Sequence, residues 1–150
     1  MTRTTAREIA VHMSYATVMN RRNVREMLDS FFDPEYFETL AVEDEVYEEY
    51  PDDRQLAYIC RIAEGVAEHA AELDAYIEKY AVNWQFSRIS RVAAAIMRTA
   101  MYEILYFPEV PYKAAANEAV ELAKVYEGKE AASFINGILA SFIREEKSLE

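Results

Sequence analysis

Apolar residues recur at helical spacing along almost the whole chain, and no segment alternates apolar and polar residues as a β-strand would. A first helix is predicted to begin near Thr4 or Thr5. Its apolar stripe consists of Ala6, Ile9, Ala10, Met13 and Ala16. A short second helix ends at Asp33-Pro34, because a proline disfavours helical backbone in the residue before it.

The middle of the chain predicts a loop region followed by a long helix. Residues 35–50 are acidic and rich in tyrosine, and we expect one short helix and a loop there. Pro51-Asp52-Asp53 offers capping groups and places acids near the positive end of a helix dipole. One helix is therefore predicted from this point to about Tyr80.

Three helices are predicted for the C-terminal half. The first begins with a cap at Ser87 and continues to about Phe107, where Pro108 ends it. It is apolar over two adjacent stripes, which predicts a central, buried position. The second begins at Pro111, a residue suited to a first helical turn, and ends near Gly128, and the third covers 129–146. The whole pattern predicts an all-α protein with six or seven helices.

Small residues in the last two helices predict close packing. The helix after Pro111 contains Ala114, Ala115, Ala116, Ala119 and Ala123, and we expect it to lie between the central and the last helix. Gly137 interrupts the apolar repeat of the last helix, at a propensity cost of about 1 kcal/mol. A close helix contact would explain this glycine, so a leucine there is expected to destabilise the fold.

Composition describes a folded protein and offers no catalytic motif. Apolar residues make up 52% of the chain and charged residues 29%. No apolar run reaches the roughly 18 residues of a membrane span, and one cysteine, Cys60, leaves no internal disulfide, so we expect a cytoplasmic protein without membrane contact. His12 and His69 lack metal-ligand spacing, and the acids between 43 and 53 lack the calcium-loop order. We therefore expect no enzyme activity, metal or cofactor.

The net charge of −11 is unevenly distributed. Residues 1–30 contain five arginines and three acids, a net charge of +2, whereas residues 31–60 contain ten acids and one arginine, a net charge of −9. Residues 84–113 return to +2, with four basic residues against two acids. The acidity is therefore local, and two segments remain able to present a basic face to nucleic acid.

The first basic face would follow from a first helix that continues as far as Arg25. On a helical wheel, the residues within about 40° of Arg7 are Arg3, Ser14, Val18, Arg21 and Arg25, with Arg22 slightly further round. Arginine suits phosphate because its planar fork binds two oxygens at once. A solvated face with intrahelical ion pairs, such as Arg22 with Glu26, explains the same pattern.

A second face is predicted on the central helix, where arginines lie beside an aromatic residue as RNA-binding surfaces require. It consists of Arg88, Arg91, Ala95, Arg98 and Tyr102. The alternative is structural, since Arg98 and Glu103 would tie neighbouring helices together in a half-buried helix. The residues favour neither reading.

Four segments together resemble the NusB family of bacterial transcription antitermination factors. They are TAREIAVHMSY at 5–15, RISRVAAAIMRTAMYEILY at 88–106, VPYKAAANEAVELAK at 110–124 and SFINGIL at 133–139. The similarity covers nearly the whole chain and is weakest at about 30–60. It implies a single NusB-like RNA-binding domain of two roughly perpendicular helical sub-bundles, 1–80 and 84–147.

The resemblance also implies a function and its residues. NusB proteins bind boxA RNA of ribosomal leader transcripts together with NusE, a small-subunit ribosomal protein, and act on the RNA polymerase elongation complex; some form homodimers. Expected RNA contacts are Arg3, Arg7, Tyr15, Arg21, Arg22, Tyr80, Arg88 and Arg91. Expected contacts to the protein partner are Tyr15, Ala93, Met97 and Glu130.

Several positions depart from the family pattern. Thr4 and Thr5 replace common basic residues, and Ala93 replaces an acid of the surface that meets NusE. Fewer phosphate contacts predict weaker and less salt-sensitive RNA binding. Two other functions stay open: a protein-interaction module with weak or lost RNA binding, and an accessory domain of an RNA methyltransferase, which would need a separate catalytic domain.

Overall fold

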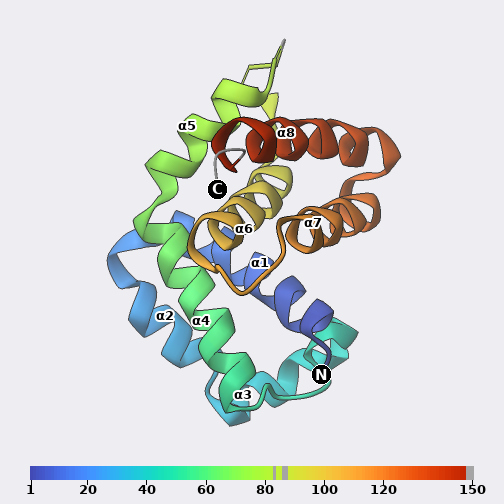
Figure 1. Ribbon diagram of the computed structural model, residues 1–150. Helices are drawn as coiled ribbons and strands as arrows, with labels where there is room; N and C mark the ends of the chain where they lie inside the picture. The colour runs from blue at the N-terminus through green and yellow to red at the C-terminus, as the bar shows by residue number, and fades with distance from the viewer. Residues whose placement is uncertain (83, 86–87, 148–150) are drawn as a thin grey trace. The chain divides into compact units, whose positions relative to one another are not determined.

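The computed structural model describes residues 1–82, 84–85 and 88–147, and these residues form helices and no strand (Figure 1). Within this part of the chain there are eight α-helices and three short 3-10 helices. The predicted all-α class is confirmed, with a helix count slightly above the expected six or seven. The chain divides into two compact units, Met1–Glu68 and His69–Glu150.

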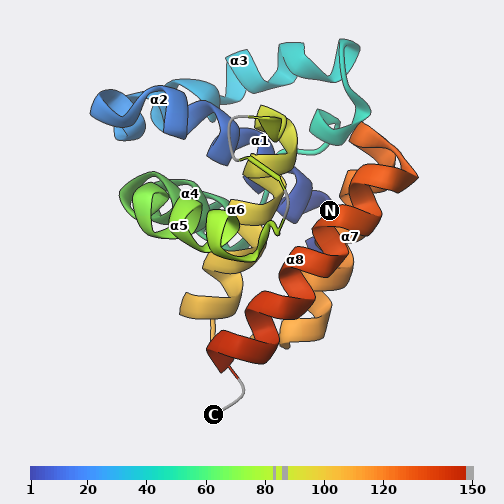
Figure 2. The ribbon, with the colours of Figure 1, turned by 90° about the horizontal axis from the view of Figure 1, so that it is seen from above.

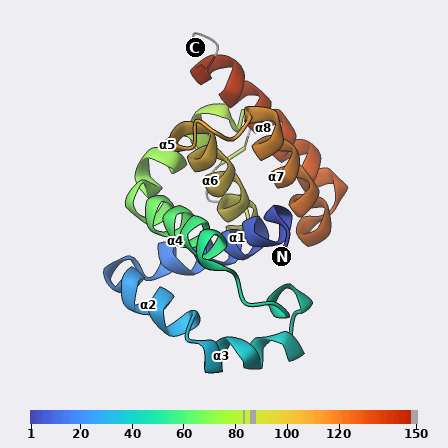
Figure 3. The same cartoon turned by 60° about the horizontal axis from the view of Figure 1, so that its bottom comes forward.

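Helices α1 (Arg3–Met19) and α4 (Asp53–Glu68) pack against each other in the first unit. The Thr2 side chain caps α1 by accepting a hydrogen bond from the Thr5 amide at 3.1 Å, so the helix begins one or two residues before the predicted start at Thr4 or Thr5. Ile9, Ala10, Ile59 and Ile62 are fully buried. The apolar stripe of α1 therefore faces the core, and its first turn stands beside the N-terminal half of α4 (Figure 3).

Between these helices lie short elements held together by aromatic rings. They are the 3-10 turn Arg21–Asn23, α2 (Val24–Phe31), α3 (Pro34–Glu38) and two further 3-10 turns, Thr39–Val42 and Glu45–Tyr47. Phe37 is 2% exposed, and its ring lies 5.6 Å from that of Tyr47 and 5.0 Å from that of Tyr50. Asp33 caps α3 through the Tyr36 amide. Aromatic packing thus gives the acidic segment a small core of its own.

The helix predicted from Asp53 to Tyr80 is wrong as a single element, because it is interrupted at His69. That residue has φ −103° and ψ 15°, outside helical geometry, and α5 (Ala70–Tyr80) begins after it. The His69 ring lies 4.7 Å from the Tyr106 ring, and its Nδ1 lies 3.2 Å from a Glu72 carboxylate oxygen. The contact with Tyr106 is tertiary and accompanies the break, and the spacing of the apolar residues gives no sign of it; Glu72 is only three residues from His69 in the sequence.

Helix α6 (Arg91–Tyr106) is the most buried helix of the second unit, as its two apolar stripes predict. Ser90 caps it, accepting a hydrogen bond from the Ala93 amide at 3.0 Å. The predicted cap, Ser87, lies outside the described residues. Helix α6 packs against α5, α7 (Tyr112–Glu127) and α8 (Lys129–Lys147). Helix α5 also contacts α8, so its contacts lie within the unit His69–Glu150, whereas the expected first sub-bundle extended over 1–80.

Helices α7 and α8 lie side by side, joined at Gly128 (Figure 2). Gly128 has φ +95°, a left-handed backbone conformation that favours glycine and ends α7 where the sequence predicts. Helix α7 contacts both α6 and α8, and its Ala115, Ala119 and Ala123 are buried. The expected place of the alanine-rich helix is confirmed.

The expectation for Gly137 is wrong. This glycine lies on the exposed side of α8, and a Cβ built there would meet no atom within 4 Å. The repeat of apolar residues around it is buried without any need for a small residue at 137. Gly137 therefore marks no helix contact, and its substitution by a larger residue has room.

Candidate nucleic-acid interface

The first turns of α1 place two arginines over one tyrosine. Arg3 and Arg7 are four residues apart and share a helix face. The Arg3 guanidinium carbon lies 4.0 Å from the centre of the Tyr58 ring, and that of Arg7 lies 5.9 Å from it. Arg3 is exposed, whereas Arg7 is 6% exposed and Tyr58 5%. We call these three residues the Tyr58 stack.

Helix packing holds the Tyr58 stack together. Tyr58 lies on α4, and α4 packs against α1 along the same stretch. One helical turn before Tyr58, the Gln55 side-chain amide donates a hydrogen bond to the Met1 carbonyl at 2.5 Å. This bond and the Thr2 cap fix the start of α1 against α4. The exposed Arg3 side chain therefore extends from a backbone segment that these hydrogen bonds hold in place.

The predicted line of arginines along one helix does not form, because α1 ends at Met19. Arg21 and Arg22 lie on the following 3-10 turn, and Arg25 lies on α2. Ser14, which the wheel placed on the same face, is 1% exposed. Arg21 and Arg22 are nevertheless exposed, so they remain accessible cations.

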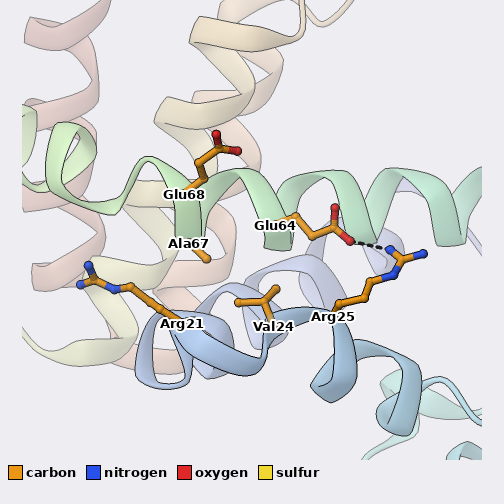
Figure 4. A pocket seen from close by; sticks show the side chains of 6 residues that line it. All are labelled: Arg21, Val24, Arg25, Glu64, Ala67 and Glu68. Atoms are coloured by element: carbon orange, nitrogen blue, oxygen red, sulfur yellow. Dashed lines mark hydrogen bonds and ion pairs between the residues drawn. The ribbon is translucent and has the colours of Figure 1, made fainter.

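A shallow hollow next to this turn is lined by equal numbers of arginines and glutamates (Figure 4). Its lining residues are Arg21, Val24, Arg25, Glu64, Ala67 and Glu68. Arg25 forms an ion pair with Glu64 at 2.6 Å, while the Arg21 side chain extends away from that pair. Since Glu64 and Glu68 balance the two cations, the hollow lacks the positive excess that an anion site needs.

Tyr15 and His12 complete the outward part of α1. The Tyr15 side chain is 38% exposed, as a surface contact requires. His12 is half-buried, and its Nδ1 is hydrogen-bonded to the Tyr47 hydroxyl. Burial lowers the pKa of His12, which keeps the ring neutral at pH 7. His12 thus joins α1 to the Glu45–Tyr47 turn and adds no charge to the surface.

In the second unit, the hydroxyl group of Tyr80, a predicted RNA contact, is already hydrogen-bonded to a carboxylate. The Tyr80 hydroxyl donates a hydrogen bond to Glu146 of α8, and the Lys79 ammonium lies 3.0 Å from the same carboxylate. Desolvation and this bond raise the pKa of Tyr80, and the donors Tyr80 and Lys79 lower the pKa of Glu146. The cluster joins α5 to the end of α8.

The second predicted basic face separates into two parts. Arg88 and Arg91 are exposed. Arg98 instead makes a two-pronged contact with Asp74 of α5, with Nε at 2.6 Å and Nη2 at 3.2 Å from the two carboxylate oxygens. Ala95 and Tyr102 are buried. The structural reading of Arg98 is therefore correct, and only the first two arginines remain available to a ligand.

The residues expected to meet a protein partner differ in exposure. Met97 is 0% exposed and Ala93 5%, so both residues are buried. Glu130 is exposed in the first turn of α8. The assignment of these residues to a partner surface stays a prediction. Of the three, Glu130 is accessible enough to contact a partner.

The sequence predicted Arg3 and Arg7 as RNA contacts but gave no prediction for Tyr58, whose ring lies against both. The spacing of Arg3 and Arg7 shows that they share one helix face, but it does not show which helix packs against that face.

Among the described residues, no group of three histidine, cysteine or acidic side chains is placed to hold a metal ion. No helix in the same residues is long and apolar enough to cross a membrane.

Comparison with known proteins identifies relatives over nearly the whole chain. A model of the NusB family matches residues 4–144. The transcription antitermination protein NusB of Clostridium botulinum is 34% identical over 143 residues, which cover 95% of this chain and 100% of the relative. The protein of the same name from Acetivibrio thermocellus is 38% identical over 144 residues, covering 96% and 90%.

Solved structures show the same fold. T. maritima NusB superposes with a TM-score of 0.73 at 25% identity, covering 97% of this chain and 92% of that one. A structure of the antitermination factors NusB and NusE in complex with dsRNA gives a TM-score of 0.68 at 21% identity, with 93% of each chain covered. At this identity the second likeness establishes the fold alone.

Proposed function

We propose that this chain, which belongs to the NusB family, is a transcription antitermination factor that binds boxA-type RNA jointly with NusE. The relatives at 34% and 38% identity bear the name of that activity, which is not an enzymatic one. A protein of the same fold was solved with NusE and double-stranded RNA. The observation that carries the proposal to particular residues is the exposed Arg3 guanidinium on the Tyr58 ring.

Arg3, Tyr15, Arg21 and Arg22 form the proposed RNA contacts of the first unit, since all four are exposed. Arg7 is buried, and its part in binding is proposed to be support of this surface. In the second unit the proposed contacts are Arg88, Arg91 and Tyr80. Tyr80 contributes its ring edge, because its hydroxyl is already bonded to Glu146.

The proposed protein partner is NusE, with Tyr15 and Glu130 as exposed candidates for its contact; Ala93 and Met97 are also proposed for this surface, although both are buried. The pair would act in the cytoplasm on the RNA polymerase elongation complex. A homodimer that uses the same surfaces in the absence of RNA remains part of the proposal. Each of these partners requires its own binding measurement.

The test is a titration of fluorescently labelled boxA RNA with this protein, with NusE, and with both. Joint binding that exceeds either protein alone supports the proposal. A control RNA of the same length with a scrambled boxA sequence reports non-specific phosphate binding. If NusE binds and RNA affinity is unchanged by its presence, the chain is a protein-interaction module. That second function is favoured by the burial of Arg7 and by the occupied Tyr80 hydroxyl.

A further inference from the structure

We propose that Tyr58 is a positioning residue for RNA binding, which holds the Arg3 guanidinium in place for an RNA phosphate. The inference rests on the proposed RNA-binding function and adds a residue that makes no RNA contact of its own. Tyr58 is 5% exposed, so the ring acts through Arg3. The contact distance of 4.0 Å between the Arg3 guanidinium carbon and the ring centre is typical of a cation–π pair.

Stacking uses the face of a guanidinium and leaves its edge available. The N–H donors of arginine point outward in the plane of the group, and two of them can bind two phosphate oxygens at once. The Arg3 guanidinium carbon lies over the Tyr58 ring and the residue is exposed, so contact through the flat face of the group would leave these donors open to solvent. An ion pair with a carboxylate would instead occupy the same donors. The ring therefore orders the cation without taking away what phosphate needs.

Positioning matters because a free arginine loses much side-chain freedom when it binds. A side chain that is already ordered loses less, and the affinity rises accordingly. The start of α1 is ordered by the Thr2 cap and by the Gln55 hydrogen bond to the Met1 carbonyl. Gln55 and Tyr58 belong to the same helix, so α4 orders both the backbone and the side chain of this RNA contact.

Arg7 extends the same arrangement inward. Its guanidinium carbon lies 5.9 Å from the Tyr58 ring centre, and the side chain is 6% exposed. Two arginines at i and i+4 repel each other along a helix. A shared ring attracts both, which favours the arrangement in which Arg3 lies outside and Arg7 inside. We therefore expect Arg7 to influence RNA affinity through Arg3 and Tyr58.

The experiment compares two classes of Tyr58 variant in the boxA RNA titration with NusE. Tyr58→Phe keeps the ring and is expected to bind RNA like the unmodified protein. Tyr58→Met fills the same space with an adaptable side chain but removes the ring, and is expected to weaken binding about two- to fivefold. Combining Tyr58→Met with Arg3→Ala should add nothing to the loss caused by Arg3→Ala. Independent, multiplying losses, or a folded Tyr58→Met variant with unchanged affinity, would overturn the inference.

A second measurement needs no RNA. In the NMR spectrum, the Arg3 side-chain protons should show an upfield ring-current shift in the unmodified protein and in Tyr58→Phe, and lose it in Tyr58→Met. Absence of this shift in the unmodified protein overturns the inference even if RNA binds. If Tyr58→Met fails to fold, the shift in the other two proteins decides. Failure of the unmodified protein to bind boxA RNA, with or without NusE, would instead refute the proposed function.

Discussion

Tyr58 and Tyr80 each lie beside a cationic side chain, and the two cations are held in different ways. In the first unit, Arg3 rests on the face of Tyr58 and remains exposed. In the second unit, Lys79 lies 5.2 Å from the Tyr80 ring centre, and both residues donate to the Glu146 carboxylate. An uncharged ring orders a cation and leaves its charge in place, whereas a carboxylate cancels it.

The comparison extends to the other arginines of the predicted RNA surface. Arg98 and Arg25 are each paired with a carboxylate at 2.6 Å, so they behave like Lys79. Arg3, Arg88 and Arg91 are exposed. Arg25 is exposed and nevertheless paired with Glu64, so the availability of a basic residue depends both on its exposure and on whether an acid from another helix is paired with it.

The largest expected effect concerns stability. Arg98→Ala should lower the free energy of unfolding by about 2–3 kcal/mol, because it leaves the partly buried Asp74 carboxylate without its partner. Urea denaturation measures this change. Arg91→Ala, at the exposed start of the same helix, is the control and should stay within about 0.5 kcal/mol. Equal stabilities for the two variants would show that the Arg98 pair is not structural.

Arg3→Ala should weaken binding of boxA RNA about three- to tenfold and leave the stability unchanged within about 0.5 kcal/mol. The logarithmic salt slope should fall by about 0.7, the value for one phosphate contact on a single strand. Titrations at several salt concentrations give both numbers. Arg144→Ala removes the same charge from an exposed position and serves as the control. If both variants lose affinity equally, net charge alone explains binding.

Few accessible arginines also predict a shallow salt dependence for the unmodified protein. Arg7 and Arg98 are largely buried, so fewer cations reach phosphate than the sequence contains. A steep slope in the same titrations would contradict this expectation and would assign phosphate contacts to residues outside the proposed set.

Gly137→Ala should stabilise the protein by about 0.5–1 kcal/mol, since alanine has the higher helix propensity and nothing lies within 4 Å of the new Cβ. Thermal unfolding of this variant and of Gly137→Leu provides the test. A loss of stability in Gly137→Ala would indicate a contact that the helix surface does not show.

The smallest effect is expected for Glu146→Gln, about 0.5 kcal/mol of stability at pH 7. The pKa of Glu146 is lowered in the folded state, so its contribution is present above the unfolded pKa of about 4.3 and is lost as pH falls through the folded value. The stability difference between the two proteins should therefore vanish in acid. The substitution removes the negative charge beside Lys79, although the glutamine oxygen can still accept from the Tyr80 hydroxyl; RNA affinity should therefore rise about twofold if Tyr80 is an RNA contact.

The sequence predicted most helices because their boundaries are local chemistry. Pro111 and Gly128 act within one turn of their own helix, and the structure confirms the boundaries that they predict. The break at His69 was missed because it accompanies a ring contact with Tyr106, which is distant in the sequence and which no local pattern contains. Gly137 was misread because a glycine in an apolar repeat has the same appearance whether or not a neighbouring helix approaches.

The pattern of neighbouring residues along the sequence thus determined the helical class, the central place of α6 and the family to which the chain belongs. The tertiary structure decided which basic residues remain available. Arg3 and Arg98 are the same residue type, yet Arg3 contacts the ring of Tyr58 and Arg98 is paired with the carboxylate of Asp74. The physical reason is that exposure and charge compensation depend on which helices pack together, and that information is not local to either arginine.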